Sequence, residues 1–195
     1  MSQDNPPLIL KPNDINQYNI KYSIPRQSQT SKTTKYVGIT YQDQDSSEIV
    51  PFFIHTPALQ IPWGVSNWDN SITIDVSFSN LQNDPSIQEF HNCIKSIEQK
   101  IYNDVRDPKY SKIWLGPKHK GDVKVTSSIK NSNEYPDTMR FRIQMNKKRT
   151  NYNLEIYDQQ RMVLFDRNCD LNIQQSLALI QKSIPKGSKV QGIIE

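Results

Sequence analysis

The chain has 195 residues, a formal net charge of +4 and a hydrophobic content of 35%. This length allows one domain-sized core, and the hydrophobic share lies below the roughly 45–50% of typical globular domains, which predicts a modest core with long polar loops. The sequence has neither a basic, apolar leader nor a long apolar run, which argues against a signal peptide and a membrane span.

Strands dominate the first part of the predicted fold. Residues 1–17 are rich in Pro, Asn and Asp, which predicts a flexible or irregular arm before one domain over residues 18–195. Alternating apolar and polar residues predict strands over 18–24 and 35–41. A short apolar run over 49–54, interrupted by Pro51, favours a third strand.

The chain is organised around Phe52–Phe78, FFIHTPALQIPWGVSNWDNSITIDVSF. Prolines and a glycine in its middle exclude a regular helix and predict a shaped loop. The final SITIDVSF alternates strictly, which predicts a strand with one buried face. Two of the three tryptophans, Trp63 and Trp68, lie in the loop. Both interpretations of them stay open: packing in the core, or a platform for a ligand.

One long helix is predicted over residues 84–106. Asp84 is a good N-cap, and Pro85 suits the first helical position. Apolar residues then recur every three or four positions and form one stripe, made of Ile87, Phe90, Ile94, Ile97, Ile101 and Val105. The opposite face, which includes Lys95 and Lys100, is expected to face solvent.

After this helix, residues 109–121, KYSKIWLGPKHKG, predict a basic loop. Strands are expected over 122–130 and 139–145, and Arg140 and Arg142 share the polar face of the second. Residues 146–151, NKKRTN, predict a basic turn. A hairpin over 152–157 and 161–165, a short helix over 173–182 and a strand over 190–194 complete the pattern. Because there is no βαβ alternation, we expect a mainly β fold, a small antiparallel barrel or sandwich with one long amphipathic helix.

The sequence offers no catalytic constellation. His55, His91 and His119 are dispersed, and no metal-binding or nucleophile motif is present. The two cysteines, Cys93 and Cys169, lack ligand-like spacing, so we expect free thiols in a reducing compartment. We therefore expect no enzyme activity, no metal site and no cofactor.

Positive charge is concentrated in residues 106–149, which hold 12 Lys and Arg against 4 Asp and Glu, whereas the rest of the chain holds 12 against 16. A solvated loop region would explain this pattern, and so would a groove for single-stranded nucleic acid, where cations contact phosphates and aromatic rings stack on bases. The candidate contacts for the second interpretation are Tyr110, Lys112, Trp114, Lys118, Lys120, Lys124, Arg140, Arg142, Lys147, Lys148, Arg149 and Trp68.

Several motifs carry a resemblance to a known family. They are HTPALQIPWGV at 55–65, the strand TIDVSF, the helix FHNCIKSIEQKI, the segment Trp114–Gly116, and a strand entry with Tyr135, Pro136, Met139 and Arg140. From about residue 52 onward, the sequence resembles the single-stranded DNA-binding proteins of nucleocytoplasmic large DNA viruses, which are related to the single-stranded DNA-binding protein of phage T7.

The resemblance implies an OB-fold, a Greek-key barrel with a helix capping one end. It also implies sequence-independent binding of single-stranded DNA in replication, recombination or repair. Such proteins commonly end in an acidic tail that recruits partners, whereas this sequence ends at GIIE, so tail-mediated recruitment stays open.

The expected partner is therefore single-stranded DNA, with RNA as the alternative ligand and with replication proteins or further copies of the chain as additional partners. The expected location is intracellular, at a viral replication site in the host cytoplasm or in a virion. The alternative function is a structural or scaffold protein of a virion, whose aromatic loop would contact other proteins.

Overall fold

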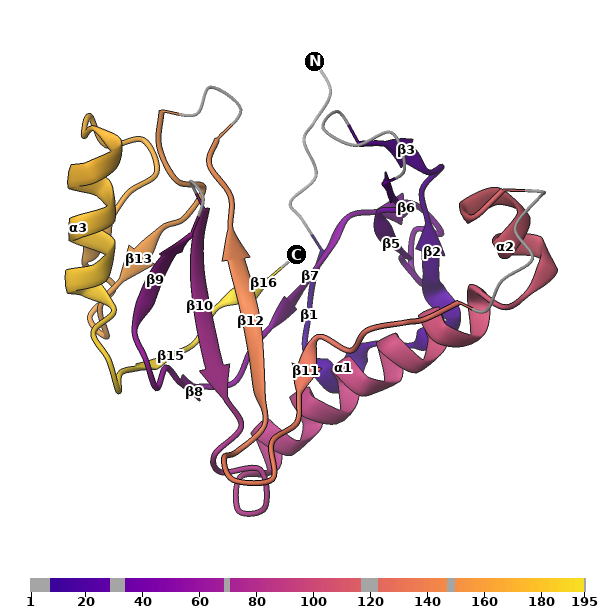
Figure 1. The fold of residues 1–195 in the computed structure, drawn as a ribbon, viewed down its shortest axis with the longest axis horizontal. Coiled ribbons are helices and arrows are strands. Elements are labelled where there is room, and N and C mark those ends of the chain that lie inside the picture. Colours follow the sequence, from indigo (N-terminus) through magenta and orange to yellow (C-terminus); the bar gives the residue numbers. More distant parts are fainter. Residues whose placement is uncertain (1–7, 29–33, 69–70, 117–122, 147–149, 195) are drawn as a thin grey trace. The chain divides into compact units, whose positions relative to one another are not determined.

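The computed structural model describes residues 8–28, 34–68, 71–116, 123–146 and 150–194, apart from the side chain of Trp68. Several antiparallel sheets and one 20-residue helix confirm the antiparallel strands and the long helix expected from the sequence (Figure 1). The expectation of a mainly β fold is too narrow, because 26% of the chain is helix and 30% is strand. No closed barrel forms among the described residues.

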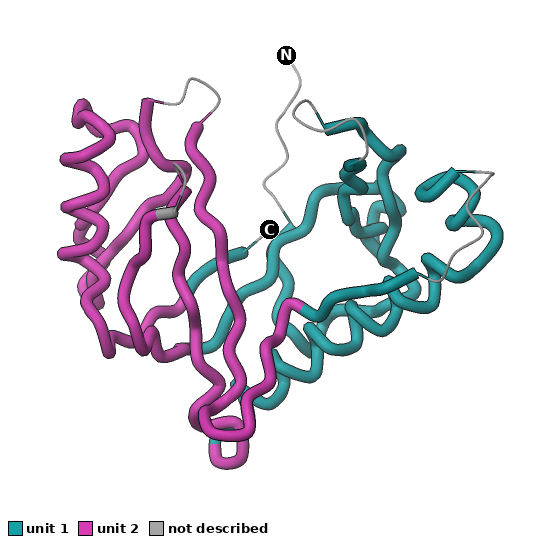
Figure 2. The backbone as a smooth tube through the Cα atoms, viewed as in Figure 1, with its two compact units in different colours: residues 1–57, 84–127, 192–195 teal, residues 58–83, 128–191 magenta. Residues whose placement is uncertain are grey.

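The chain groups into two compact units (Figure 2). Unit 1 consists of residues 1–57, 84–127 and 192–195, and unit 2 of residues 58–83 and 128–191. Neither unit is one continuous stretch of chain, because the chain passes between them four times. The single domain expected over 18–195 stays a prediction.

Unit 1 holds three small sheets. In the first, β7 lies between β1, which is parallel to it, and β16, which is antiparallel to it. The second has the order β2-β5-β6, and the third is the β3-β4 pair. The strands are β1 (Leu8–Leu10), β2 (Ile20–Tyr22), β3 (Arg26–Gln27), β4 (Lys35–Tyr36), β5 (Ile39–Gln42), β6 (Ile49–Val50), β7 (Phe52–His55) and β16 (Ile193–Ile194). β1 lies within the segment expected to be irregular, because its apolar residues pair with a strand distant in sequence.

The helices of unit 1 are α1 (Pro85–Asp104) and α2 (Pro108–Trp114), with 3-10 turns at Pro12–Asp14 and Gln17–Asn19. The Asp84 carboxylate accepts hydrogen bonds from the backbone N–H groups of Ser86 and Ile87, at 3.0 and 3.4 Å, and so caps α1 as predicted. The predicted apolar stripe is buried at Ile87, Phe90, Ile94, Ile97 and Val105.

Unit 2 is built on a six-stranded antiparallel sheet with the order β11-β12-β10-β8-β15, in which β9 also pairs with β10. A separate hairpin, β13-β14, and the helix α3 complete the unit. The elements are β8 (Leu59–Gln60), β9 (Val65–Trp68), β10 (Ser71–Ser77), β11 (Ile129–Lys130), β12 (Thr138–Ile143), β13 (Ile156–Tyr157), β14 (Val163–Phe165), α3 (Ile173–Ser183) and β15 (Lys189–Val190). Asn172 and Gln175 form a capping box that starts α3 at its predicted position.

Strands β10 and β12 give the central sheet two different faces. Ile72, Ile74 and Val76 lie opposite Ile143, Phe141 and Met139, whereas Thr73, Asp75 and Ser77 lie opposite Arg142, Arg140 and Thr138. Opposed residues of an antiparallel pair share a face of the sheet. The first set belongs to the core, since the three β10 side chains are buried. The second set is polar, as the alternation predicted, but Thr73 and Ser77 are also buried, at 7% and 5% exposure, so the expectation that β10 buries only one face is wrong.

The strand predicted over residues 122–130 is wrong for most of its length. Among its described residues, only Ile129–Lys130 form a strand, β11, and only Ile129 is buried, at 4% exposure. The carbonyl of Val123 instead accepts a hydrogen bond from the Arg106 guanidinium at 2.8 Å. An alternating pattern without a core to bury its apolar side does not hold a strand.

None of the helices within the described ranges is long and apolar enough to cross a membrane.

Candidate nucleic-acid interface

The predicted basic loop at residues 109–121 begins instead with the helix α2, so that part of the prediction is wrong. The carboxylate of Asp107 accepts a hydrogen bond from the backbone N–H of Lys109 at 2.8 Å, and Pro108 occupies the first turn. This is the same Asp-Pro signal that starts α1 at Asp84 and Pro85, and it would have identified α2 from the sequence.

α2 brings two of the predicted site residues together. The rings of Tyr110 and Trp114 lie 5.3 Å apart, and Tyr22 of β2 packs edge-on against both, at 5.4 Å from Tyr110 and 4.7 Å from Trp114. We call Tyr22, Tyr110 and Trp114 the aromatic cluster. Trp114 is half-buried in it, so only part of the surface of this candidate contact is open to a ligand.

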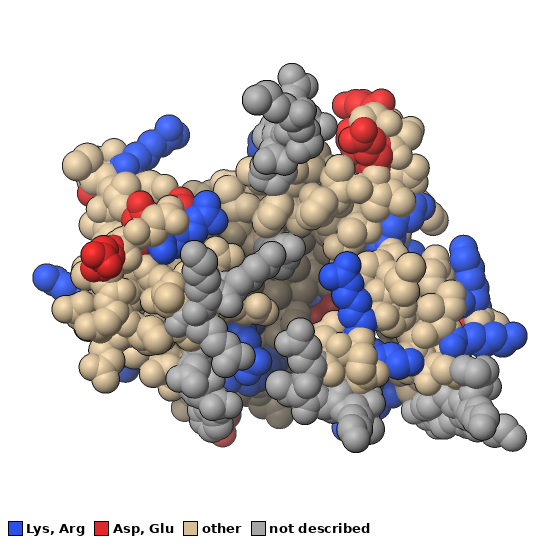
Figure 3. Space-filling view, turned by 90° about the horizontal axis from the view of Figure 1, so that it is seen from above, with Lys and Arg blue, Asp and Glu red and all other residues tan. Residues whose placement is uncertain are grey.

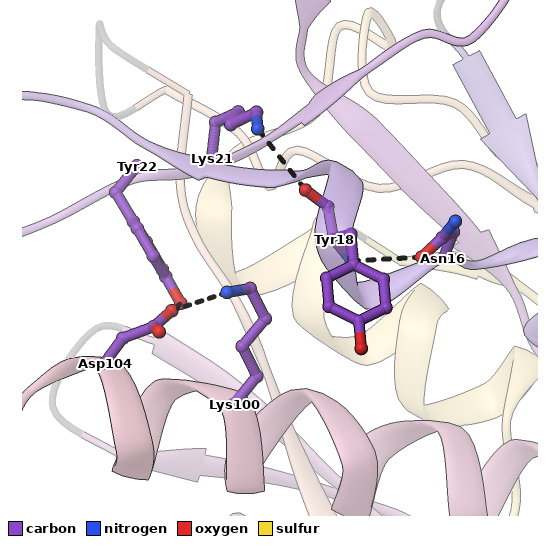
Figure 4. Close-up of polar contacts among 6 residues, drawn as sticks. All are labelled: Asn16, Tyr18, Lys21, Tyr22, Lys100 and Asp104. Carbon is purple, nitrogen blue, oxygen red and sulfur yellow. Dashed lines mark hydrogen bonds and ion pairs between the residues drawn. The ribbon is translucent and has the colours of Figure 1, made fainter.

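A charged pair on α1 anchors the aromatic cluster. The Tyr22 hydroxyl donates a hydrogen bond to the Asp104 carboxylate at 2.5 Å, and Lys100 Nζ lies 2.7 Å from the same carboxylate and 5.8 Å from the Tyr22 ring centre (Figure 4). Burial of the ring, followed by the hydrogen bond to Asp104, raises the pKa of Tyr22 above its ordinary value. Lys100, expected on a solvated face, is half-buried because it pairs with Asp104.

A hollow of about 680 Å³ lies beside this network in unit 1, lined by Asn13–Tyr18, Lys100, Asn103 and Asp104. Its lining is rich in amides and carboxylates, which can donate and accept hydrogen bonds. The Asn16 side chain accepts a hydrogen bond from the backbone N–H of Tyr18, and the ring of Tyr18 is 86% exposed (Figure 4). Tyr18 and Tyr22 were not predicted as site residues, because their alternation only indicated a strand.

Three lysines of unit 1 lie in or after the helix α2. Lys109 Nζ lies 5.2 Å from the centre of the Tyr110 ring, and Lys112 lies in the last turn of α2. Lys112 and Lys124 are exposed, and Lys109, Lys112 and Lys124 form no ion pair within the described part of the chain. Because these three lysines form no ion pair within the described residues, their charge is available to an anion. Figure 3 shows one face of the molecule, on which Lys and Arg side chains lie at the surface in several places.

The two arginines predicted on β12 differ in their environment. Arg140 makes a two-pronged contact with Asp75 of β10, in which Nε and Nη2 each lie 2.7 Å from a carboxylate oxygen. The hydrogen bonds and charge of Asp75 raise the pKa of Arg140. Arg142 lies opposite Thr73, is exposed, and has no ion pair among the residues described. Arg140 is thus largely neutralised, which the sequence did not predict, and Arg142 is the free cation of this strand.

Other predicted contacts lie outside what the structure describes. They are Lys118, Lys120, Lys147, Lys148 and Arg149, together with the side chain of Trp68, whose backbone is the last residue of β9. The described contacts divide between the two units, with Tyr110, Lys112, Trp114 and Lys124 in unit 1 and Arg140 and Arg142 in unit 2. That all of them line one groove stays a prediction.

Metal chemistry finds no support in the described ranges of the chain, where no group of three or more His, Cys, Asp or Glu residues could hold a metal ion. Burial raises the pKa of the Cys93 thiol to about 11, which disfavours its reactive thiolate at neutral pH. Comparison with protein-family models and with curated proteins finds no match to this chain.

Proposed function

We propose that this chain binds single-stranded DNA independently of sequence, in replication, recombination or repair. The observation that carries the proposal is the helix α2, where Lys109 and Lys112 have no acidic partner among the described residues and flank Tyr110 of the aromatic cluster. Cations next to aromatic rings are what sequence-independent binding of single strands needs, because phosphates and base faces recur at every nucleotide.

Further side chains extend this surface. Tyr18 offers an exposed ring on unit 1. The hollow that Tyr18 helps to line offers polar groups that can form hydrogen bonds with a base edge or a sugar. Arg142 adds a free cation on unit 2. The OB-fold-like barrel implied by the resemblance belongs to this proposal: its support is the order of antiparallel strands, then a long helix, then further strands of the same sheet, with β10 before α1 and β12 after it.

A salt titration of oligonucleotide binding tests the proposal. A labelled oligo(dT) should bind the full chain at low salt, and the logarithm of the binding constant should fall with the logarithm of salt concentration by about 0.7 per neutralised phosphate. Oligonucleotides of other sequences should bind with similar affinity. Competition with an RNA oligonucleotide of equal length distinguishes DNA from RNA as the preferred ligand. No binding at low salt would rule the proposal out.

The alternative function is a structural or scaffold protein of a virion that uses the aromatic loop, in which Trp63 is 54% exposed, for protein contacts. The same titration separates the two functions, because a scaffold protein would self-associate or bind protein without the steep salt dependence that phosphate contacts produce.

A further inference from the structure

The turn that carries Trp63 is held firmly although its indole is exposed. Pro62 fixes one backbone angle before the indole, and Gly64 after it adopts a φ of +76°, which favours glycine. A Cβ at Gly64 would lie 3.3 Å from the backbone nitrogen of Lys186, so the chain at Lys186 packs directly against the turn. The exposure of Trp63 is therefore a property of a supported turn.

Residues 184–189 run along this turn through backbone contacts. The N–H of Ile61 donates to the carbonyl of Ser188 at 2.8 Å, and the N–H of Gly187 donates to the carbonyl of Ile61 at 2.7 Å. In the adjoining strands, Lys189 of β15 pairs with Gln60 of β8. The chain after α3 thus lies next to the residues on both sides of Trp63, more than 100 positions away in sequence.

All the charged side chains at the end of α3 and in the residues that follow it, up to Gln191, are cations. Residues 181–191, QKSIPKGSKVQ, contain Lys182, Lys186 and Lys189 and no Asp or Glu. All three lysines are exposed, and none forms an ion pair within the described residues. The comparison of residues 106–149 with the rest of the chain conceals these three lysines, because the rest of the chain as a whole has more acidic than basic residues.

Trp63 is exposed on a turn that packs against the backbone of Lys186, in a segment whose lysines form no ion pair within the described residues. This combination favours a polyanion over a protein partner. Protein interfaces are depleted in Lys at their cores, since burying an ammonium group costs solvation that an apolar partner does not return. A nucleic-acid strand satisfies both features, because its bases stack on indole and its phosphates attract lysine.

We propose that Trp63 with Lys182, Lys186 and Lys189 forms a second contact site for single-stranded nucleic acid, on unit 2, in which the indole stacks on a base and the lysines contact neighbouring phosphates. The inference rests on the proposed function and adds a site to it, separate in its residues from the aromatic cluster of unit 1.

The test uses the full chain with Trp63 as the only tryptophan, made by Trp68→Phe and Trp114→Phe. Oligo(dT) binding is followed by anisotropy of the labelled oligonucleotide and by Trp63 fluorescence in the same titration. We expect Trp63 to be quenched with the same binding curve. Trp63→Ala in the wild-type background should weaken binding about tenfold, and Trp63→Tyr should restore most of the loss, because a base can stack on either ring.

A matched pair of lysine variants tests the phosphate contacts. Lys186→Gln should weaken binding about threefold and make the salt slope shallower by about 0.7, the value for one phosphate contact. Lys95→Gln removes the same charge from the exposed face of α1 and should leave both quantities almost unchanged.

The outcomes separate this inference from the proposed function. Oligonucleotide binding with unquenched Trp63 fluorescence, or with Trp63→Ala binding like the wild type, overturns the second site and leaves the function standing. The same holds if Trp63→Ala abolishes self-association but keeps oligonucleotide affinity, which would make the indole a protein contact. A wild-type chain that binds no oligonucleotide at low salt overturns both.

Discussion

Tyr22 connects the sheet of β2 to both helices of unit 1 through one side chain. Its ring contacts Tyr110 and Trp114 of α2, and its hydroxyl donates to Asp104 at the end of α1. Lys100 holds the same carboxylate from one helical turn away. Two such partners compensate the half-buried carboxylate of Asp104 for the hydrogen bonds to water that it loses on folding. Removing one partner leaves that loss partly uncompensated.

We predict that Tyr22→Phe lowers the free energy of unfolding by about 1 kcal/mol at neutral pH, because it removes a hydrogen bond to a charged group that Lys100 continues to pair. Urea denaturation measures the change. Tyr18→Phe is the control, since its ring is 86% exposed and should leave the stability unchanged. Equal stability of Tyr22→Phe and the wild type would contradict the hydrogen bond to Asp104.

The stability difference between the wild type and Tyr22→Phe should depend on pH. The pKa of Tyr22 is raised in the folded chain, so the folded state holds this proton more tightly than the unfolded state does. Its contribution is fully present below the unfolded pKa of about 10 and is lost as the pH rises beyond that value. The stability difference between wild type and Tyr22→Phe should therefore stay constant up to about pH 9 and shrink above about pH 10.

Trp114 should affect stability as well as binding. Its contacts with Tyr22 and Tyr110 are each worth about 0.5–1.5 kcal/mol, so Trp114→Ala should lower the free energy of unfolding by about 1–3 kcal/mol. Trp114→Phe keeps an aromatic ring and should recover most of this loss. Trp63→Ala serves as the comparison in urea denaturation, because that indole is 54% exposed. A Trp114→Ala chain as stable as the wild type would mean that the aromatic cluster does not hold α2.

At the scale of elements, the polar face of β10 and β12 distinguishes two arginines of the same strand. Arg140 is held by Asp75 through two hydrogen bonds, whereas Arg142 is exposed opposite Thr73. A cation already paired with a carboxylate adds little to the attraction of a phosphate, because the pair is close to neutral at a distance.

Arg142→Gln is therefore expected to make the salt slope of oligonucleotide binding shallower by about 0.7. The matched control is the double variant Asp75→Asn/Arg140→Gln, which removes the whole ion pair without changing the net charge, and its slope should equal that of the wild type. Anisotropy titrations at several salt concentrations measure both. A larger effect from the double variant than from Arg142→Gln would show that Arg140, and not Arg142, faces the ligand.

At the scale of the whole molecule, the path of the chain links the two units. Each crossing joins secondary structure in one unit to secondary structure in the other, as where β10 of unit 2 is followed by α1 of unit 1. Since neither unit is a continuous stretch, no single cut in the chain releases one of them whole.

We predict that both units unfold in one transition. Two single-tryptophan chains report on them separately, one with Trp63 in unit 2 and one with Trp114 in unit 1. Their urea midpoints should coincide after correction for the stability cost of each set of Trp→Phe changes, because coincident transitions from different probes indicate two-state unfolding. Clearly separated midpoints would contradict the single domain predicted over residues 18–195.

Local patterns sufficed for much of the fold. The Asp84-Pro85 start and the stripe of α1, the alternation of β10 and β12, and the position of α3 follow from spacings of two, three or four residues, which the backbone geometry of strands and helices dictates. The same rules were available for α2 at Asp107 and Pro108, but the lysines and glycines that follow favoured a loop.

The sequence by itself determined which residues are cations and aromatics and which strands have a polar face. Tertiary structure alone decided which of them are available to a ligand. Asp75 neutralises Arg140 from 65 positions away, Tyr22 packs against Trp114, and residues 184–189 bring Lys186 and Lys189 to the turn of Trp63. Each of these depends on a contact between segments far apart in the chain, and the periodicity of a short segment carries no information about its distant partners.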